Sequence, residues 1–489
     1  IFIACIMRRL AGRSATLRAD TCSQASLIQK VHMDTPGPAN PSSHTDATTA
    51  SAPRTGYAWY VVIILMLAAV VSLVDRLLVG LLVDPIRRDL QISDFQISLL
   101  QGLAFSLFFC LAGLPIGRLV DRSHRRNIVA IGISFWSLMT AAAGLAQTYW
   151  QLFLTRAGVG VGEAALGPAA YSIISDYFPK SRLPLALSVF ALGTALGSGV
   201  AFVIGGAVGG IAARGDVAVP VLGVVHGWQL AFILVGLPGL LMAALTLTIR
   251  EPARRNTIAG GSAVPISAVV DFLRERRRLA LCFVVGISMA FTVSYALLAW
   301  VATFFIRVHG MAVGQVGTLL GAIILSMSTL GIFGGGWLAS IFLRRGQRDA
   351  TLRTAMWTMA AAIPFLIAAP LMPTPALSML AYIPAILLSS VFISLGTSTI
   401  QLVTPNEMRG QVSALGLMLT TVVGSVLGPS LVAACTDYLF ADEKMVGVSL
   451  ALVCGIVAPM SAATLACSLK PLRTAAEQAE RWAAPDERA

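Results

Sequence analysis

Long apolar runs alternate with short polar breaks along the chain, from Tyr57 to about Leu469. Each run has roughly twenty apolar residues, enough to cross the ~30 Å hydrocarbon core of a bilayer. Because backbone groups in lipid must bond within their own segment, such runs form helices. The pattern predicts an all-α polytopic membrane protein with about twelve spanning helices, over residues 57–83, 95–120, 127–146, 149–177, 182–210, 226–249, 278–307, 313–342, 352–371, 376–404, 410–439 and 444–469.

The longest polar stretch between these runs lies in the middle of the series, from Glu251 to Arg278. Within it, residues 266–273 alternate as in a short amphipathic helix, which we expect to lie along the cytoplasmic interface. The stretch divides the chain into two six-helix bundles, 57–250 and 278–470, joined by a linker at 251–277. Residues 1–56 are expected to form a disordered tail without a secretory signal, and residues 471–489 a cytoplasmic tail.

The two halves carry similar segments at matching positions. Gly117 to Arg126 follows the second predicted helix, and Gly336 to Arg345, with its Gly, Leu and Arg pair at the same spacing, follows the eighth. The loops at 179–182 and 405–409 also correspond. Duplicated halves that rock about a midplane site are a common transporter architecture. We therefore expect the two bundles to be pseudo-symmetric.

The composition agrees with a membrane protein and excludes several other classes. Only 12% of the residues are charged, whereas a soluble domain carries about twice that fraction. The 35 Lys and Arg exceed the 23 Asp and Glu. They gather in alternate loops, however, which is the positive-inside bias and places both termini in the cytoplasm. Nucleic-acid binding is not expected. Abundant Ala and Gly, with far more Arg than Lys, favour a bacterial chain and hence the inner membrane.

Cysteine usage indicates neither cross-links nor metal. The seven cysteines are scattered without paired spacing, so we expect no disulfide framework, no metal site and no cofactor. We expect the chain to act as a monomer, with membrane lipids as its surroundings and partners.

Four charged side chains interrupt otherwise apolar spans: Asp75, Arg76, Arg156 and Glu163. A charge at the bilayer centre costs about 2.5–3.5 kcal/mol even on the mildest scale, so these groups must face a protein-lined or watery interior. Arg156 and Glu163 are two turns apart on nearly the same helix face. We expect Asp75 to contact Arg156, with Glu163 deeper in the membrane. A purely structural ion pair between the two helices is the alternative.

The functional interpretation of these charges is proton coupling. Burial disfavours an ionised carboxylate and a nearby Arg favours it, so Asp75 and Glu163 can take up and release protons as a cavity alternates between wet and closed. Arg156, and Arg76 beside it, can hold an anionic head group through paired hydrogen bonds.

The Gly117–Arg126 segment suggests a latch at the cytoplasmic side. Gly117 would allow close helix approach, and the Asp121 carboxylate can accept from helix N-terminal amides and from arginines of a neighbouring loop. A basic topology signal is the simpler alternative. The remaining candidate latch residues are Arg122, Arg125, Arg126 and Arg182.

The second half has a different chemical character. Residues 279–306 carry no charge and offer only hydroxyl and aromatic polar groups. An interior that is charged on one side and apolar with hydroxyls on the other suits an amphipathic molecule. Helix–helix packing uses the same small polar residues and remains an equal alternative. The candidate cavity residues are Thr292, Tyr295, Trp300, Ser394 and Thr397.

The chain resembles the major facilitator superfamily, whose loop between helices two and three carries Gly-x-Leu-x-Asp-Arg-x-x-Arg-Arg, with His124 here in place of the family's usual Gly. It is similar in particular to the spinster-type branch, including bacterial members. This likeness implies a twelve-helix transporter fold and transport of lysophospholipids or sphingolipids such as sphingosine-1-phosphate, in some members with protons. The segments that carry it are 74–76, 135–138, 154–164 and 404–411.

Together these observations favour a secondary active transporter of an amphipathic lipid that works by alternating access with proton coupling. A proton-coupled drug or organic-anion carrier of the same fold is the alternative, because cavity charges alone do not select lipids. An enzyme is not expected, since no span offers a Ser–His pair, facing aspartates or a zinc signature. The absence of a Gly-x-x-x-x-Gly-Lys loop argues against an ATP-driven pump.

Overall fold

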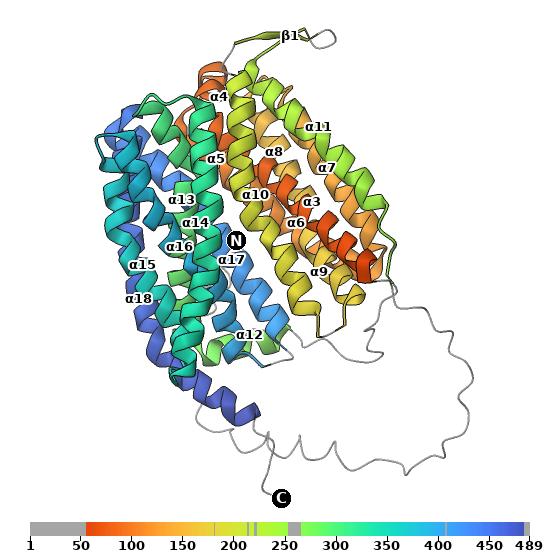
Figure 1. Ribbon diagram of the computed structural model, residues 1–489, viewed down its shortest axis with the longest axis vertical. Coiled ribbons are helices and arrows are strands. Elements are labelled where there is room, and N and C mark those ends of the chain that lie inside the picture. Colours follow the sequence, from red (N-terminus) through yellow and green to blue (C-terminus); the bar gives the residue numbers. More distant parts are fainter. Residues whose placement is uncertain are drawn as a thin grey trace, which may run out of the picture.

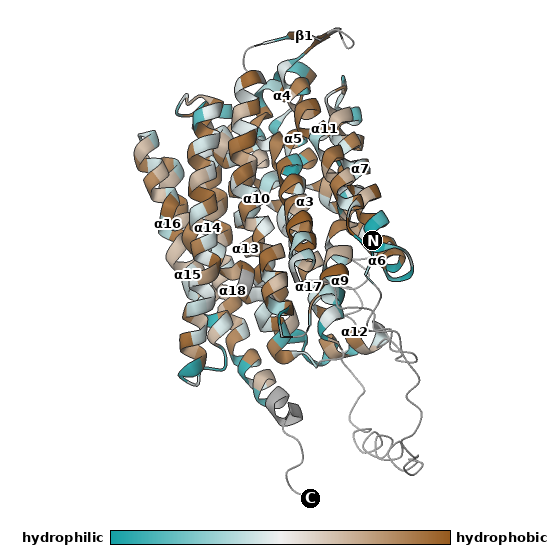
Figure 2. Cartoon of the chain, turned by 45° about the vertical axis from the view of Figure 1, so that its right-hand side comes forward, coloured by the Kyte–Doolittle hydropathy of each residue, from teal (hydrophilic) through white to brown (hydrophobic). Residues whose placement is uncertain are grey.

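The computed structural model describes residues 55–179, 181–212, 215–219, 223–252, 266–405 and 408–483. Two helical bundles stand side by side, and apolar residues run along the length of their spans (Figures 1 and 2). The expected tail at 1–56 lies almost wholly outside the described residues.

The described residues of the first bundle form nine helices and a pair of short strands. They are α3 (Thr55–Leu81), α4 (Val83–Leu90), α5 (Asp94–Gln101), α6 (Leu103–Arg122), α7 (Arg125–Ala143), α8 (Tyr149–Glu163), α9 (Leu166–Tyr177), α10 (Leu183–Ala212), β1 (Val217–Val219), β2 (Gly223–Val225) and α11 (Gly227–Leu247).

The linker helix α12 (Ile266–Glu275) leads into the second bundle. That bundle contains α13 (Arg277–Arg307), α14 (Val313–Arg344), α15 (Ala350–Ala368), η2 (Ala369–Leu371), α16 (Pro375–Val403), α17 (Arg409–Ala434), η3 (Cys435–Phe440), η4 (Glu443–Met445) and α18 (Val446–Ala483). The helix α18 continues beyond the predicted end of the last span, because Arg473 donates to Asp349 at 2.8 Å and Arg348 pairs with Glu477 at 3.1 Å.

Eleven helices of the described chain are long and apolar enough to cross a membrane. The remaining predicted span, 149–177, is interrupted at Ala164 and Ala165, between α8 and α9. Pro168 explains the interruption, because it has no N–H to donate to the carbonyl of Ala164 and its ring crowds that carbonyl. Interrupted spans are a device by which transporters build sites at membrane depth.

The two ends of the molecule differ in how the bundles meet. We call them the α4 end, which carries α4 and the two strands, and the α12 end (Figure 1). At the α4 end one buried apolar cluster joins both bundles, with Leu82 and Ile97 of the first and Phe304 of the second. At the α12 end the first bundle has a separate buried cluster that includes Val120 and Ile249. The bundles are thus packed together at the α4 end.

A hairpin caps the α4 end outside the spans. Strands β1 and β2 pair antiparallel, with Val217 opposite Val225. His226, which follows β2, contacts Asp216 at 2.8 Å and Asp89 of α4 at 3.1 Å. The hydrogen bond to Asp216, reinforced by the Asp89 charge, raises the pKa of His226 above its ordinary value. The His226 ring therefore links the hairpin to α4 through its contacts with Asp216 and Asp89.

Closely packed glycines join α10 to α14 across the bundles. A Cβ added at Gly317 would lie 2.4 Å from the carbonyl oxygen of Phe202, and one added at Gly206 would lie 2.8 Å from the Cα of Gly317. Such distances leave no room for a methyl group, so the two backbones are in direct contact.

Gly317→Ala is therefore expected to destabilise the fold by about 1–3 kcal/mol, the usual cost of overpacking. The measurement is the thermal midpoint in detergent. Gly336→Ala on the same helix is the matched control, because a Cβ there meets nothing within 4 Å. Equal midpoints for the two variants would show that the close approach contributes nothing.

Candidate functional site

The charges singled out in the sequence meet between α3 and α8. Arg76 donates to the Oε2 atom of Glu163 at 2.9 Å. Arg156 donates to the backbone oxygens of Asp75 at 3.0 Å and of Arg76 at 3.1 Å. Asp75 and Arg156 are 0% exposed and Glu163 is 3% exposed. The predicted proximity of these residues is confirmed, and they form a buried charge cluster.

The expected contact between Asp75 and Arg156 is made in a different way. The Arg156 guanidinium binds carbonyl groups of α3, and the Arg76 side chain, not Arg156, pairs with Glu163. The reason is geometric: adjacent side chains on a helix point about 100° apart, so Asp75 and Arg76 do not meet the same partner, and the Asp75 carboxyl stays near Glu163 and Arg156 without a hydrogen bond to either. The Asp75 carboxyl also lies near the Trp136 indole of α7.

Asp75 has an unusual environment for a carboxyl. Neither of its oxygens has a hydrogen-bond partner among the described residues, and the same holds for the Oε1 atom of Glu163 and for the Trp136 indole nitrogen. Burying an unpartnered ionised carboxylate is very costly, so such a group is normally neutral or hydrated. The arrangement suits a group that gains and loses a proton.

Aromatic rings on α6 complete the cluster, although neither of them was among the predicted site residues. The Arg76 guanidinium lies 3.9 Å from the centre of the Phe105 ring and 5.9 Å from that of Phe109. The two rings are one turn apart on one face of α6, and this spacing was the available signal. This cation–π contact stabilises the Arg76 guanidinium, so Arg76 needs no acidic partner besides Glu163.

Glu163 is the last residue of α8, directly before the interruption at Ala164. The C-terminal end of a helix carries a partial negative charge that attracts cations. Arg76 therefore pairs with a carboxylate that is itself carried by the negative end of α8. Pro168, which causes the interruption, was a second signal that the sequence analysis passed over.

The candidate latch residues are divided between two environments. Arg125 is 1% exposed and binds Asp176, Ser172 at 2.9 Å and Glu251 at 2.8 Å, and the backbone N–H of Arg126 donates to Glu251 at 2.9 Å. Asp176 and Ser172 belong to the first bundle and Glu251 begins the linker, so none of these partners lies in the second bundle, and none was predicted. The side chains of the other candidates are exposed: Asp121, Arg122 and Arg182.

Within the described part of the chain, no helix approaches Gly117 closely in this conformation. A Cβ added there meets nothing within 4 Å. Gly117 lies near the α12 end, where the apolar clusters of the two bundles are separate.

The candidate cavity residues of the second bundle are partly packing residues. The Trp300 indole is buried and donates to the carbonyl of Pro429 at 3.0 Å, and Thr292 is buried against α17 beside Gly424 and Gly428. The polar atoms of these two residues are satisfied by backbone, since the Thr292 hydroxyl donates to the Ser288 carbonyl at 2.9 Å, and this is the environment that helix–helix packing predicts. Tyr295 is half-buried. The side chains of Ser394 and Thr397 lie outside the described part of the chain.

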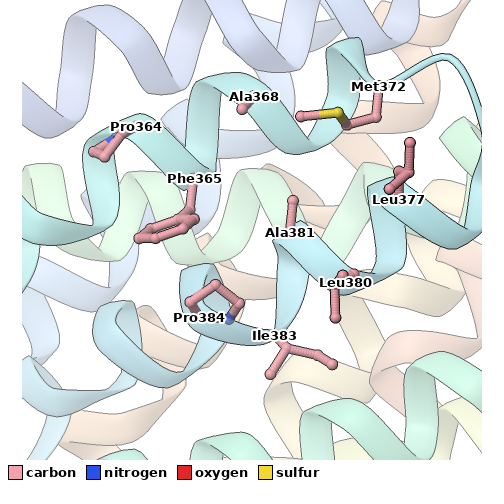
Figure 3. Close-up of a pocket in the computed structure, with 9 residues that line it drawn as sticks. All are labelled: Pro364, Phe365, Ala368, Met372, Leu377, Leu380, Ala381, Ile383 and Pro384. Atoms are coloured by element: carbon pink, nitrogen blue, oxygen red, sulfur yellow. The ribbon is translucent and has the colours of Figure 1, made fainter.

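A groove of about 570 Å³ lies between α15 and α16. Its lining is apolar, with Phe365, Leu380 and two prolines, Pro364 and Pro384, among the residues shown in Figure 3. It has no charged lining residue and belongs to a different bundle from the charge cluster. We therefore do not assign it to the candidate site.

Comparison with known proteins identifies the family. A spinster homologue 3 from Danio rerio is 28% identical over 443 residues, which cover 87% of this chain and 84% of that protein. A major-facilitator-type efflux pump from Mycolicibacterium smegmatis is 29% identical over 410 residues, covering 81% and 88%.

Among solved structures, a bacterial homologue of the human lysosomal transporter Spinster, inward-facing and unoccupied, superposes with a TM-score of 0.70 at 25% identity. The match covers 87% of this chain and 98% of that one. The sequence pattern of the Major Facilitator Superfamily matches residues 65–429. The resemblance to spinster proteins is confirmed, as is the prediction of a transporter in place of an enzyme. This multi-pass chain belongs to the Major Facilitator Superfamily.

Proposed function

We propose that this chain moves an amphipathic lipid, of the lysophospholipid or sphingosine-1-phosphate kind, by alternating access with proton coupling. The observation that carries the proposal is the buried charge cluster: an Asp75 carboxyl with no hydrogen-bond partner among the described residues, beside an Arg76–Glu163 ion pair, inside membrane-spanning helices. An ion pair alone is a poor stabiliser, and intramembrane charges are functional by default.

The proton would act on the Arg76–Glu163 pair. Protonation of Glu163 removes the negative charge that holds Arg76, and the guanidinium, whose side chain is 20% exposed, becomes available to an anionic head group. The head-group role therefore falls to Arg76, because the guanidinium of Arg156 is committed to two backbone carbonyls. Asp75 is the second proton site.

The substrate class follows from the neighbours of Arg76. Phe105 and Phe109 place an apolar surface directly beside the cation. A head group with a phosphate on an alkyl chain matches this combination of one guanidinium with aromatic rings. The likeness to spinster proteins over most of the chain supports the same class.

The orientation follows from the basic loops. They gather at the α12 end, so the positive-inside rule places that end and both termini in the cytoplasm, in a bacterial inner membrane. The bundles meet at the α4 end, and the open surroundings of Gly117 at the other end fit an inward-open state. The latch at Gly117 and Asp121 would engage when the cytoplasmic side closes.

A carrier of drugs or organic anions is the second candidate, and the similarity to an efflux pump favours it specifically. Such a carrier would use the same charge cluster. The two candidates differ in whether the substrate needs an alkyl chain.

The test is transport in liposomes that contain the purified protein. We expect labelled lysophospholipid or sphingosine-1-phosphate to move faster when a pH gradient is imposed, and short-chain organic phosphates to compete poorly. Gradient-driven movement of drugs or hydrophilic anions without movement of either lipid would establish the second candidate. Lipid movement that ignores the gradient would remove proton coupling from the proposal.

A further inference from the structure

The α4 end holds a second cluster of charges, which joins the two bundles. Arg307, the last residue of α13, donates to Asp84 of α4 at 2.7 Å. It also binds both carboxylate oxygens of Asp94, the first residue of α5, at 2.6 and 2.9 Å. The Arg307 side chain is 5% exposed and that of Asp94 is 0% exposed. The three groups thus form a bidentate, largely dehydrated contact between bundles.

Two further contacts lie beside this one. Arg87 of α4 approaches Asp94 at 3.2 Å and pairs with Glu443 of η4 at 2.9 Å. The backbone N–H of Phe95 donates to Asp437 of η3 at 2.7 Å. The pairs with Glu443 and Asp437 also cross from the first bundle to the second.

The same helix ends close over the candidate site. Thr303, one turn before Arg307, donates to the carbonyl of Gly80 at 3.4 Å, and Gly80 is one turn after Arg76 on α3. A Cβ at Gly80 would lie 3.3 Å from the Ala299 carbonyl oxygen. Access from the α4 end to the charge cluster thus requires α3 and α13 to separate there.

Separation of the bundles divides these charges. Asp84 and Asp94 stay with the first bundle and Arg307 leaves with the second. The attraction lost on separation is offset by hydration of the freed ions. The free energy of the intact pair therefore differs little between the packed and the open states. Removing Arg307 penalises the packed state most, because there Asp94 stays fully buried with only Arg87, at 3.2 Å, as its counter-charge.

We propose that Arg307, Asp84 and Asp94 form a gate that holds the α4 end shut, and that the strength of this gate sets the fraction of molecules open at that end. Arg87 and Glu443 form its outer part. The inference rests on alternating access within the proposed function and on neither the lipid nor the proton, so it can fail or hold independently of transport.

The test is hydrogen–deuterium exchange of the full chain in lipid nanodiscs, with Arg307→Gln against the natural protein. The packed-to-open ratio at the α4 end should fall at least ~10-fold, given the cost of a buried charge that loses its bidentate partner. Exchange should then rise in residues 94–101 and 298–307. It should fall in residues 113–120 and 409–416 at the α12 end, where Gly117 and Gly410 now have open surroundings.

Three variants complete the experiment. Arg307→Lys keeps the charge without the bidentate geometry and should give a smaller shift in the same directions. Glu443→Gln changes a carboxylate that is 60% exposed, so this variant should fold. It should raise exchange at the α4 end and lower exchange at the α12 end, both slightly. Arg348→Gln removes an exposed ion pair within the second bundle and should change neither end. A rise confined to the α4 end, or no change, would overturn the gate, since only a gate links the two ends reciprocally.

Discussion

Replacing Glu163 by glutamine is expected to abolish uptake driven by a pH gradient, with a fall of at least ~10²-fold, the usual effect of removing a positioned acid–base group. Glutamine has the size of glutamate and its amide oxygen can still accept from Arg76, but it cannot exchange a proton. Arg76 would then be permanently released from its counter-charge. The measurement is uptake of labelled lysophospholipid into liposomes with and without an imposed gradient.

The variant should separate coupling from binding. Because Arg76 no longer competes with a carboxylate, binding of an anionic lipid should persist or tighten while gradient-driven uptake is lost. Glu275→Gln makes the same chemical change at an exposed residue of α12 and should leave both unchanged. Coupled uptake that survives in Glu163→Gln would rule out Glu163 as a coupling group.

A double-mutant cycle distinguishes the structural alternative. If the Arg76–Glu163 pair only holds α3 against α8, Arg76→Gln and Glu163→Gln should each lower the thermal midpoint, and the double variant should recover it. If the pair is functional, all three should lose coupled uptake whatever their midpoints are.

The spans could be predicted from the sequence because length and hydropathy alone decide whether a segment crosses a bilayer. The proximity of Asp75 and Arg156 was predictable for a similar reason, since helix direction fixes the depth of each residue. The hydrogen-bond partners of these charges could not be predicted, because they depend on the directions in which the Arg76 and Arg156 side chains leave their helices. Arg156 thus binds carbonyls of α3, and Arg76 takes the pairing with Glu163.

Contacts across long separations were the least accessible to sequence reasoning. Arg125 stood in a recognisable loop, but its partners Asp176 and Glu251 lie 51 and 126 residues away. Trp300 could have lined a cavity or packed against a helix, since the same residue type does both. The hydrogen bond from Trp300 to the Pro429 carbonyl of α17 shows its packed environment, and this contact between distant segments has no signal in the sequence.

Replacing Arg156 by methionine is expected to cost about 2–4 kcal/mol of stability, because two carbonyls lose charge-assisted hydrogen bonds. Both bonds lie where no lipid group can replace them. The measurement is the thermal midpoint in detergent, read from tryptophan fluorescence. Arg156→Lys should recover only part of the loss, since an ammonium is a point charge and cannot span two successive carbonyls as a guanidinium does. A midpoint equal to that of the natural protein would show that the contacts to α3 are not stabilising.

The same variant reports whether Asp75 carries a proton. We expect a neutral Asp75 carboxyl, since neither of its oxygens accepts a hydrogen bond from the described residues, the nearby Trp136 indole included, and an ionised carboxylate would be costly there. Asp75→Asn mimics that neutral form, so it should change the midpoint little by itself and should not rescue Arg156→Met. A clear rescue in the double variant would mean that loss of Arg156 had left an ionised Asp75 uncompensated. In that case Asp75 would be a fixed counter-ion, and Glu163 would be the proton site of the cluster.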